Sequence, residues 1–175
     1  MDGADDLERF ERELLPLMDD AYTLARYLTR DPHDAQDVVQ EAYLRALRYF
    51  DSFRGGDARA WFLTIVRHSC YSLRRKRATA PEVQPVSDEV VAEAPAAYAA
   101  DRAALDRDTR EALGRALDTL APEFREAVVL RDVHGLSYRE IARVAGVPIG
   151  TVMSRLARAR QRLQRVLGFT SREAS

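Results

Sequence analysis

Residues 135–163 read GLSYREIARVAGVPIGTVMSRLARARQRL, and this stretch decides the fold of the second half of the chain. Ser137 and Glu140 stand three residues apart, the spacing of a capping box at the start of a helix. Gly146 favours a tight turn, after which a longer helix begins. A short helix, a glycine turn and a longer basic helix together predict a helix-turn-helix unit.

The longer helix divides into an apolar and a basic face. On a helical wheel one stripe is expected to pack inward and consists of Val152, Leu156, Ala159, Leu163 and Val166. The outward stripe consists of Thr151, Arg155, Arg158 and Arg162, with Ser154 beside Arg155. Arginine binds guanine edges or phosphate through paired hydrogen bonds, and short hydroxyl side chains allow close approach to the DNA backbone. The helix is therefore predicted to recognise DNA.

The simpler alternative for this helix is a basic face that is only solvated. The capping box, the glycine turn and the absence of any acidic residue from Ile141 to Arg172 argue against it. The pattern does not separate arginines that read bases from arginines that bind phosphate.

Towards the N-terminus, the first half also has the periodicity of helices. Apolar residues recur at three- and four-residue steps, and Pro16 is expected to kink or divide the first run. A further helix should restart after Asp31-Pro32, with Asp34 as its cap. Its apolar stripe is predicted to contain Val38, Ala42, Leu44 or Arg45, and Leu47. No segment of either half alternates strictly between apolar and polar residues over five or more positions, so no sheet is expected.

Residues 78–105 contain three prolines, many alanines and few large apolar side chains. Such a segment buries too little apolar surface to offset its ordering entropy. We therefore predict an all-α protein with two small helical domains, residues 1–77 and 107–170, joined by a flexible acidic linker over residues 78–106.

The loop 51–57, DSFRGGD, leads into residues 59–77, RAWFLTIVRHSCYSLRRKR, which combine aromatic residues with four consecutive cations. Asp57 can cap the helix. Residues 51–77 hold 7 basic and 2 acidic residues, and residues 141–175 hold 7 and 1, within a net charge of −1. Two separate contacts with a polyanion are therefore possible.

Composition excludes several classes of protein. The single cysteine, Cys70, cannot form an internal disulfide, and the three histidines lie in separate segments without metal-ligand spacing. No metal site is therefore predicted. The glycine patterns of nucleotide-binding loops are also absent, so no cofactor and no enzymatic activity are predicted. No signal peptide and no run near roughly 18 apolar residues is present, so we expect a cytoplasmic protein without membrane insertion.

The order of residues resembles that of bacterial sigma factors. Residues 34–77, which begin DAQDVVQEAYLRALRYF, resemble sigma regions 2.2 to 2.4, and residues 117–163 resemble region 4. With only a short linker between these regions, the layout is similar to that of the extracytoplasmic-function group. The resemblance implies binding to RNA polymerase core, through the clamp helices of the largest subunit and the flap, and opening of promoter DNA.

The resemblance also implies roles for individual residues. The loop from Phe53 to Ala58 and the following helix would read the −10 element, with flipped bases near the loop and backbone contacts at the basic end. The predicted −10 and melting residues are Phe53, Arg54, Trp61, His68, Arg74, Arg75, Lys76 and Arg77. Core packing of Trp61 and a surface position without a role for His68 remain alternatives. Ser72 departs from the acidic or amide residue that many relatives carry.

Two further sets follow from the same resemblance. Thr151, Ser154, Arg155 and Arg158 match the −35 contacts of the family, whereas Met153 departs from an arginine often found there. Asp37, Gln40 and Glu41 share a polar helix face and match residues that contact the clamp helices. For acidic residues on a helix, a merely solvated face is the alternative.

Two other classes of protein compete with a sigma factor. A conventional two-domain regulator would bind duplex DNA tightly by itself, usually as a dimer on paired half-sites. A purely helical interaction protein would leave both basic segments without a purpose. The sequence shows no inhibitory extension before its first helix or after its last, so we also expect an anti-sigma factor as a partner.

Overall fold

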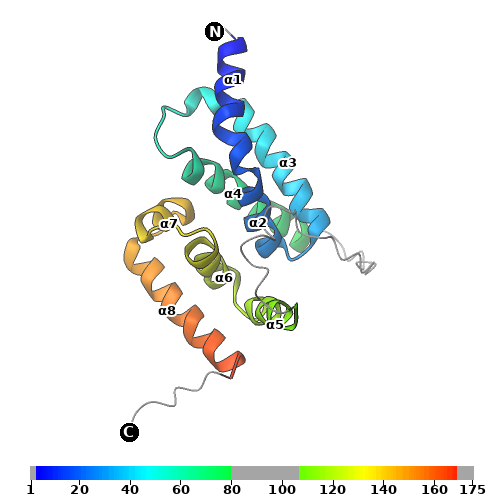
Figure 1. The fold of residues 1–175 in the computed structure, drawn as a ribbon, viewed down its shortest axis with the longest axis vertical. Helices are drawn as coiled ribbons and strands as arrows, with labels where there is room; N and C mark the ends of the chain where they lie inside the picture. The colour runs from blue at the N-terminus through cyan, green and yellow to red at the C-terminus, as the bar shows by residue number, and fades with distance from the viewer. Residues whose placement is uncertain (1–2, 80–106, 169–175) are drawn as a thin grey trace. The chain divides into compact units, whose positions relative to one another are not determined.

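The computed structural model describes residues 3–79 and 107–168, and every regular element within these ranges is helical. The prediction of an all-α protein with two helical domains is confirmed. The predicted linker lies outside the described residues, except for Ala78 and Thr79, which form the end of a helix. Each helical unit is described by itself below (Figure 1).

The first unit contains α1 (Gly3–Leu14), α2 (Met18–Thr29), α3 (Pro32–Tyr49) and α4 (Ala58–Thr79). As predicted, Pro16 divides the first run, because a short 3₁₀ turn, η1 (Leu15–Leu17), separates α1 from α2. A second 3₁₀ turn, η2 (Phe50–Ser52), follows α3. Helices α2, α3 and α4 pack against one another around Leu24, Val38 and Phe62, which are almost fully buried.

The prediction that Asp34 caps α3 is wrong. Asp31 is the cap, because its Oδ1 accepts the Asp34 N–H at 2.9 Å and Pro32 occupies the first helical position. The Asp34 N–H holds the pKa of the Asp31 carboxyl below its ordinary value, although partial burial opposes this effect. A proline at the first helical position places the cap one residue before it.

Removing this cap should destabilise the first unit in a pH-dependent way. We expect Asp31→Ala to lower the free energy of unfolding by about 1 kcal/mol at neutral pH. Because the pKa is lowered on folding, the charged cap stabilises the unit above the unfolded pKa and loses this effect as pH falls through the folded pKa. Urea unfolding of both proteins at neutral and strongly acidic pH measures the difference. If wild type and Asp31→Ala differed in free energy of unfolding by the same amount at both pH values, the charge of Asp31 would not contribute to the cap.

The predicted apolar stripe of α3 is only partly correct. Val38, Ala42 and Ala46 are buried, whereas Leu44 is 62% exposed and Leu47 is 43% exposed. The three- and four-residue steps from Leu44 place it with Gln40 and Leu47 on the outward face. Leu44 and Leu47 are thus left uncovered on the outward face of α3.

The second unit contains α5 (Arg107–Asp118), α6 (Pro122–Val128), α7 (Tyr138–Ala145) and α8 (Ile149–Val166). Helix α6 continues as a π-helical turn, η4 (Val129–Val133). Pro122 takes the first helical position of α6, as predicted. Gly135 and Gly146 have φ angles of +69° and +66°, so each supplies the left-handed residue that ends the preceding segment.

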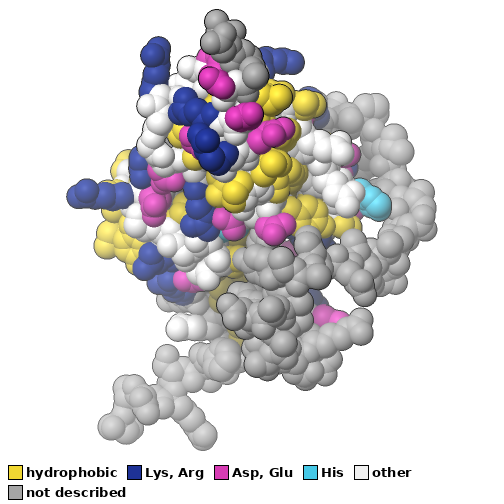
Figure 2. Space-filling model, turned by 45° about the horizontal axis from the view of Figure 1, so that its top comes forward, with side chains coloured by type: hydrophobic (Ala, Val, Ile, Leu, Met, Phe, Trp, Pro, Cys, Tyr) yellow, Lys and Arg dark blue, Asp and Glu magenta, His cyan; other side chains and the backbone are white. Residues whose placement is uncertain are grey.

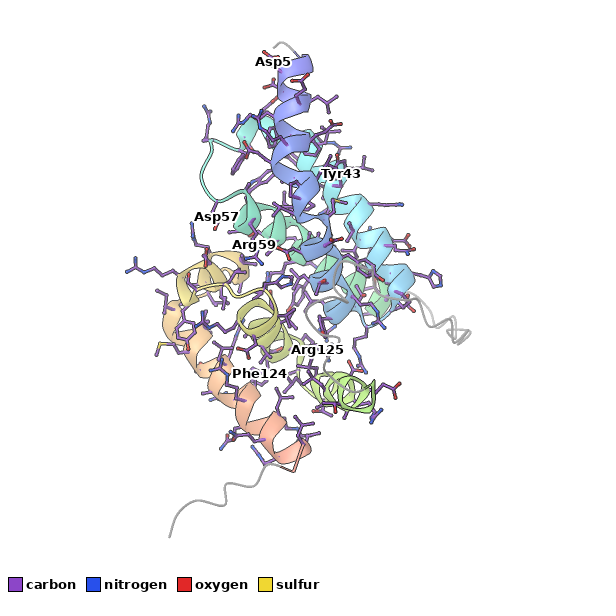
Figure 3. The ribbon with its side chains drawn as sticks, viewed as in Figure 1. Asp5, Tyr43, Asp57, Arg59, Phe124 and Arg125 are labelled. Carbon is purple, nitrogen blue, oxygen red and sulfur yellow. The ribbon has the colours of Figure 1, made fainter. Side chains whose placement is uncertain are left out.

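Arg125 joins the first two helices of this unit (Figure 3). Its side chain is buried, and its guanidinium donates to the carbonyl oxygens of Leu117 at 3.0 Å, Asp118 at 3.3 Å and Leu120 at 2.9 Å. The carbonyls of Leu117 and Asp118 lie in the last turn of α5 and that of Leu120 lies two residues beyond it, where intrahelical donors run out. Arg125 therefore caps α5 from within α6.

Candidate nucleic-acid interfaces

The helix-turn-helix is built as the sequence predicts. The Ser137 N–H donates to Glu140 Oε2 at 2.6 Å, and the Glu140 N–H donates to Ser137 Oγ at 3.2 Å, so the capping box at the start of α7 is confirmed. Val152, Leu156 and Ala159 on α8 are buried. Val166 is 43% exposed, so the inward stripe ends before the last turn.

The opposite face of α8 carries the predicted recognition residues. Ser154 and Arg158 are exposed, and Thr151 and Arg155 are half-buried. The Ser154 hydroxyl donates to the Thr151 carbonyl at 3.0 Å. Within residues 3–79 and 107–168, neither Arg155 nor Arg158 forms an ion pair, so both guanidinium groups can bind an external acceptor.

Arg160, on the same helix, has a different environment. It donates to Asp132 Oδ1 of the π-helical turn at 3.0 Å. Burial lowers the pKa of Arg160, but hydrogen bonds to Asp132 and Tyr138 outweigh it, and the pKa is raised. Arg160 therefore joins α8 to the π-helical turn η4. Its role is structural, unlike the role predicted for the arginines that face outward.

In the first unit, α4 also has two faces. Phe62, Leu63 and Val66 point into the core, as expected if Phe62 and its neighbour Trp61 face different ways. The other face carries a stripe at steps of three and four residues, which consists of Trp61, Thr64, His68, Tyr71 and Arg75. Trp61 and Tyr71 are half-buried, and His68 and Arg75 are exposed.

Tyr71 is the aromatic residue of this stripe that sequence reasoning did not assign. The Arg67 guanidinium lies 4.6 Å from the Tyr71 ring centroid, within the range of a cation–π contact. Its spacing from Trp61 and His68 would have placed it on the same face. An aromatic ring with an arginine beside it is a suitable surface for single-stranded nucleic acid.

The loop before α4 is held by an aromatic cluster and a cap. The Asp57 Oδ1 accepts the Ala60 N–H at 2.9 Å, which confirms Asp57 as the cap of α4. Figure 3 labels Asp57 and Arg59 at this end of the helix. Phe53 is only 6% exposed, and its ring lies 5.1 Å from that of Trp61 and 5.8 Å from that of Phe50. Phe53 therefore supports the loop, and its direct contact with a base stays a prediction. Arg54 is exposed.

The basic end of α4 comprises Arg74, Arg75, Lys76 and Arg77, all of which are exposed. Arg77 also forms a paired ion bridge with Asp34 of α3. This bridge ties the end of α4 to the start of α3. Within the described part of the chain, Arg74 and Lys76 form no ion pair, so they are available for phosphate.

The polar face of α3 is present as predicted, with Asp37 and Gln40 exposed. Glu41 is half-buried and pairs with Arg45 one turn later. Leu44 and Leu47 extend this face with apolar surface. Figure 2 shows hydrophobic and acidic side chains side by side on one face of the molecule. A mixed acidic and apolar helix face is suited to a protein partner.

Comparison with known proteins assigns the two units. Residues 15–79 match sigma-70 region 2, and residues 110–163 match sigma-70 region 4. The chain is 42% identical over 149 residues to the ECF RNA polymerase sigma factor SigM of Mycobacterium tuberculosis, which covers 85% of this chain and 71% of SigM. The chain belongs to the ECF group of sigma factors. As a sigma factor, it is not an enzyme.

Other relatives agree with this assignment. The chain is 38% identical over 162 residues to SigE of Mycolicibacterium smegmatis, covering 90% of this chain but only 61% of that longer protein. The structure of the sigma factor RpoE from Bartonella quintana, in complex with the anti-sigma factor NepR, aligns with a TM-score of 0.72 at 30% identity, over 92% of this chain and 98% of RpoE. In the described parts of this sigma factor, no helix is long and apolar enough to cross a membrane.

Proposed function

We propose that this sigma factor directs RNA polymerase core to promoters through separate contacts with a −35 and a −10 element, and that it opens the DNA strands. The observation that carries the proposal is the pair of outward basic faces, one on α8 of region 4 and one on α4 of region 2. A duplex-binding regulator needs only the first face. The aromatic and basic stripe of α4 is suited to a melted strand, because it combines stacking surfaces with cations.

We assign the residues as follows. Residues 1–77 form the part that binds core and the −10 element, residues 78–106 form the linker, and residues 107–170 form the part that binds the −35 element. The exposed arginines of α8 would read or grip the upstream duplex. The exposed cations at the end of α4 would hold the backbone of the melted strand.

A reconstitution experiment tests the whole proposal. Purified core should bind the protein in a pull-down, and run-off transcription from a genomic promoter library should yield transcripts that share two spaced elements. Free protein that binds duplex DNA tightly and specifically, with no affinity for core, would instead identify a conventional regulator.

Core binding is assigned to the face of α3 that holds Gln40, Glu41, Leu44 and Leu47. We expect the double substitution Gln40→Ala with Glu41→Ala to weaken core binding about tenfold or more, as for central interface residues. The thermal unfolding curve should be unchanged, because Gln40 is exposed and Glu41 pairs only within its helix in the described structure.

The matched control for this face is Arg26→Ala, which changes an exposed residue of α2. Core affinities are measured by competition against labelled wild-type protein. If the double variant competes as well as the control, this face lies outside the interface.

The same face is proposed to bind an anti-sigma factor. The related RpoE has been crystallised with NepR, and another neighbour of the same fold, CnrH, with the cytosolic domain of CnrY. An inhibitor that covers the core-binding face would keep this sigma factor inactive. Because bacterial RNA polymerase works in the cytoplasm, we propose that this sigma factor also acts there. Purification from unstressed cells without a bound inhibitor would contradict the proposed inhibition.

A further inference from the structure

Helix α1 closes over the aromatic cluster that supports the loop before α4. The Phe10 ring packs edge-on against Tyr43 and Phe50, with ring centroids 4.9 Å and 5.2 Å apart. Burial raises the pKa of Tyr43, and the charge of Glu11 raises it further, so this tyrosine stays neutral where it packs beside α1. The N-terminal helix is thus anchored at the end of the bundle from which the loop emerges.

Arg9 reaches from α1 to the first residue of that loop. Its guanidinium carbon lies 5.2 Å from the Phe50 ring centroid and 5.8 Å from the Phe53 ring centroid. The Arg9 Nε–H donates to Glu13 Oε1 at 3.0 Å, which fixes the plane of the guanidinium group. Two aromatic faces and one carboxylate therefore hold Arg9 in a single orientation.

Phe53 also contacts α4, because its ring centroid lies 5.1 Å from that of Trp61. Arg9 is therefore linked to α4 through Phe53. The two glycines that follow in the loop pack against few neighbouring atoms. Gly55 and Gly56 have φ angles of +88° and +102°, and a Cβ placed at either would meet no atom within 4 Å. The position of the loop therefore depends on Phe53 at one end and on the Asp57 cap at the other.

We propose that Arg9 is a positioning residue for recognition of the −10 element. It holds Phe53 against Trp61, and so sets where the loop and the start of α4 receive an unstacked base. Arg9 acts through Phe53 and needs no contact with DNA itself. The inference rests on the proposed function of α4 in reading the −10 element.

The test uses the full-length protein in holoenzyme, with the promoter found by run-off transcription and a set of promoters with single substitutions in its −10 element. The measured quantity is the ratio of open complex on the original promoter to open complex on each substituted one, from permanganate reactivity of unpaired thymines. Arg9→Gln should lower this ratio about 5- to 10-fold, as expected from the loss of two cation–π contacts.

Two further variants separate positioning from general stability. Arg9→Lys should recover most of the ratio, because an ammonium group also binds aromatic faces. Arg12→Gln removes an exposed cation from the same helix and should leave the ratio unchanged. Affinity for core and for a −35 duplex should be the same for all three variants and for wild type.

Three results would overturn the role of Arg9: an Arg9→Gln ratio equal to that of wild type, a lysine variant as defective as the glutamine variant, or parallel losses of core and −35 binding. Each leaves the proposed function intact, because the wild-type holoenzyme still forms a specific open complex. A wild-type holoenzyme that gives no specific transcript would refute the proposed function instead.

Discussion

Replacing Arg125 with methionine should unfold much of the region 4 unit under conditions in which the wild-type unit is folded. Methionine preserves most of the apolar contacts but removes the Arg125 donor from the carbonyls of Leu117, Asp118 and Leu120, of which only that of Leu117 keeps a backbone donor in the described structure, the Leu120 N–H at 3.1 Å. Each buried carbonyl without a partner costs about 1–3 kcal/mol, so we expect a loss of about 3–5 kcal/mol. A domain of this size has a total stability of only about 3–9 kcal/mol.

Urea unfolding followed by circular dichroism measures this loss, and the −35 duplex reports whether the unit still binds DNA. The control is Arg115→Met, because Arg115 is 71% exposed and lies 3.8 Å from Glu111. Its substitution should change the free energy of unfolding by about 0.5 kcal/mol or less. If Arg125→Met is as stable as the control, the cap of α5 is energetically unimportant.

Local signals in the sequence predicted the ends of helices well. The capping box at Ser137 and Glu140, the cap at Asp57 and the first-turn Pro122 each depend on residues within one helical turn, so no knowledge of tertiary structure was needed. The failure at Asp34 has the same local origin. Pro32 and Asp34, two positions later, gave competing signals for the start of the helix, and the proline determined the start of α3.

Contacts over longer distances were not predictable in this way. The apolar pattern of α3 does not distinguish the core from an apolar surface left for a partner, and Leu44 and Leu47 belong to the second kind. Arg125 is an ordinary surface residue by type, and only the packing of α6 against the end of α5 gives it three carbonyl partners. The cluster of Phe50, Phe53 and Trp61 likewise depends on the tertiary packing that brings the end of α3 beside the start of α4.

The double substitution Arg155→Ala with Arg158→Ala should abolish most transcription that depends on the −35 element. Both guanidinium groups face outward, and neither has an ion partner in the described structure. A guanidinium that reads a base contributes about 1–3 kcal/mol of discrimination, so the pair should contribute about 2–5 kcal/mol if the effects are nearly additive. Because the two residues are three positions apart on one helix, some coupling between them is expected.

Two measurements separate base reading from phosphate binding by these arginines. If Arg155 or Arg158 reads a base, its alanine variant should lose the preference at one position of the −35 element. If it binds phosphate, the variant should weaken binding to every sequence equally and reduce the salt slope by about one. Arg165→Ala removes an exposed cation from the last turn of the same helix and controls for net charge. Equal losses in this control and in the single variants Arg155→Ala and Arg158→Ala, which each remove one positive charge, would show that only the total charge of α8 matters, because a specific contact depends on position as well as on charge.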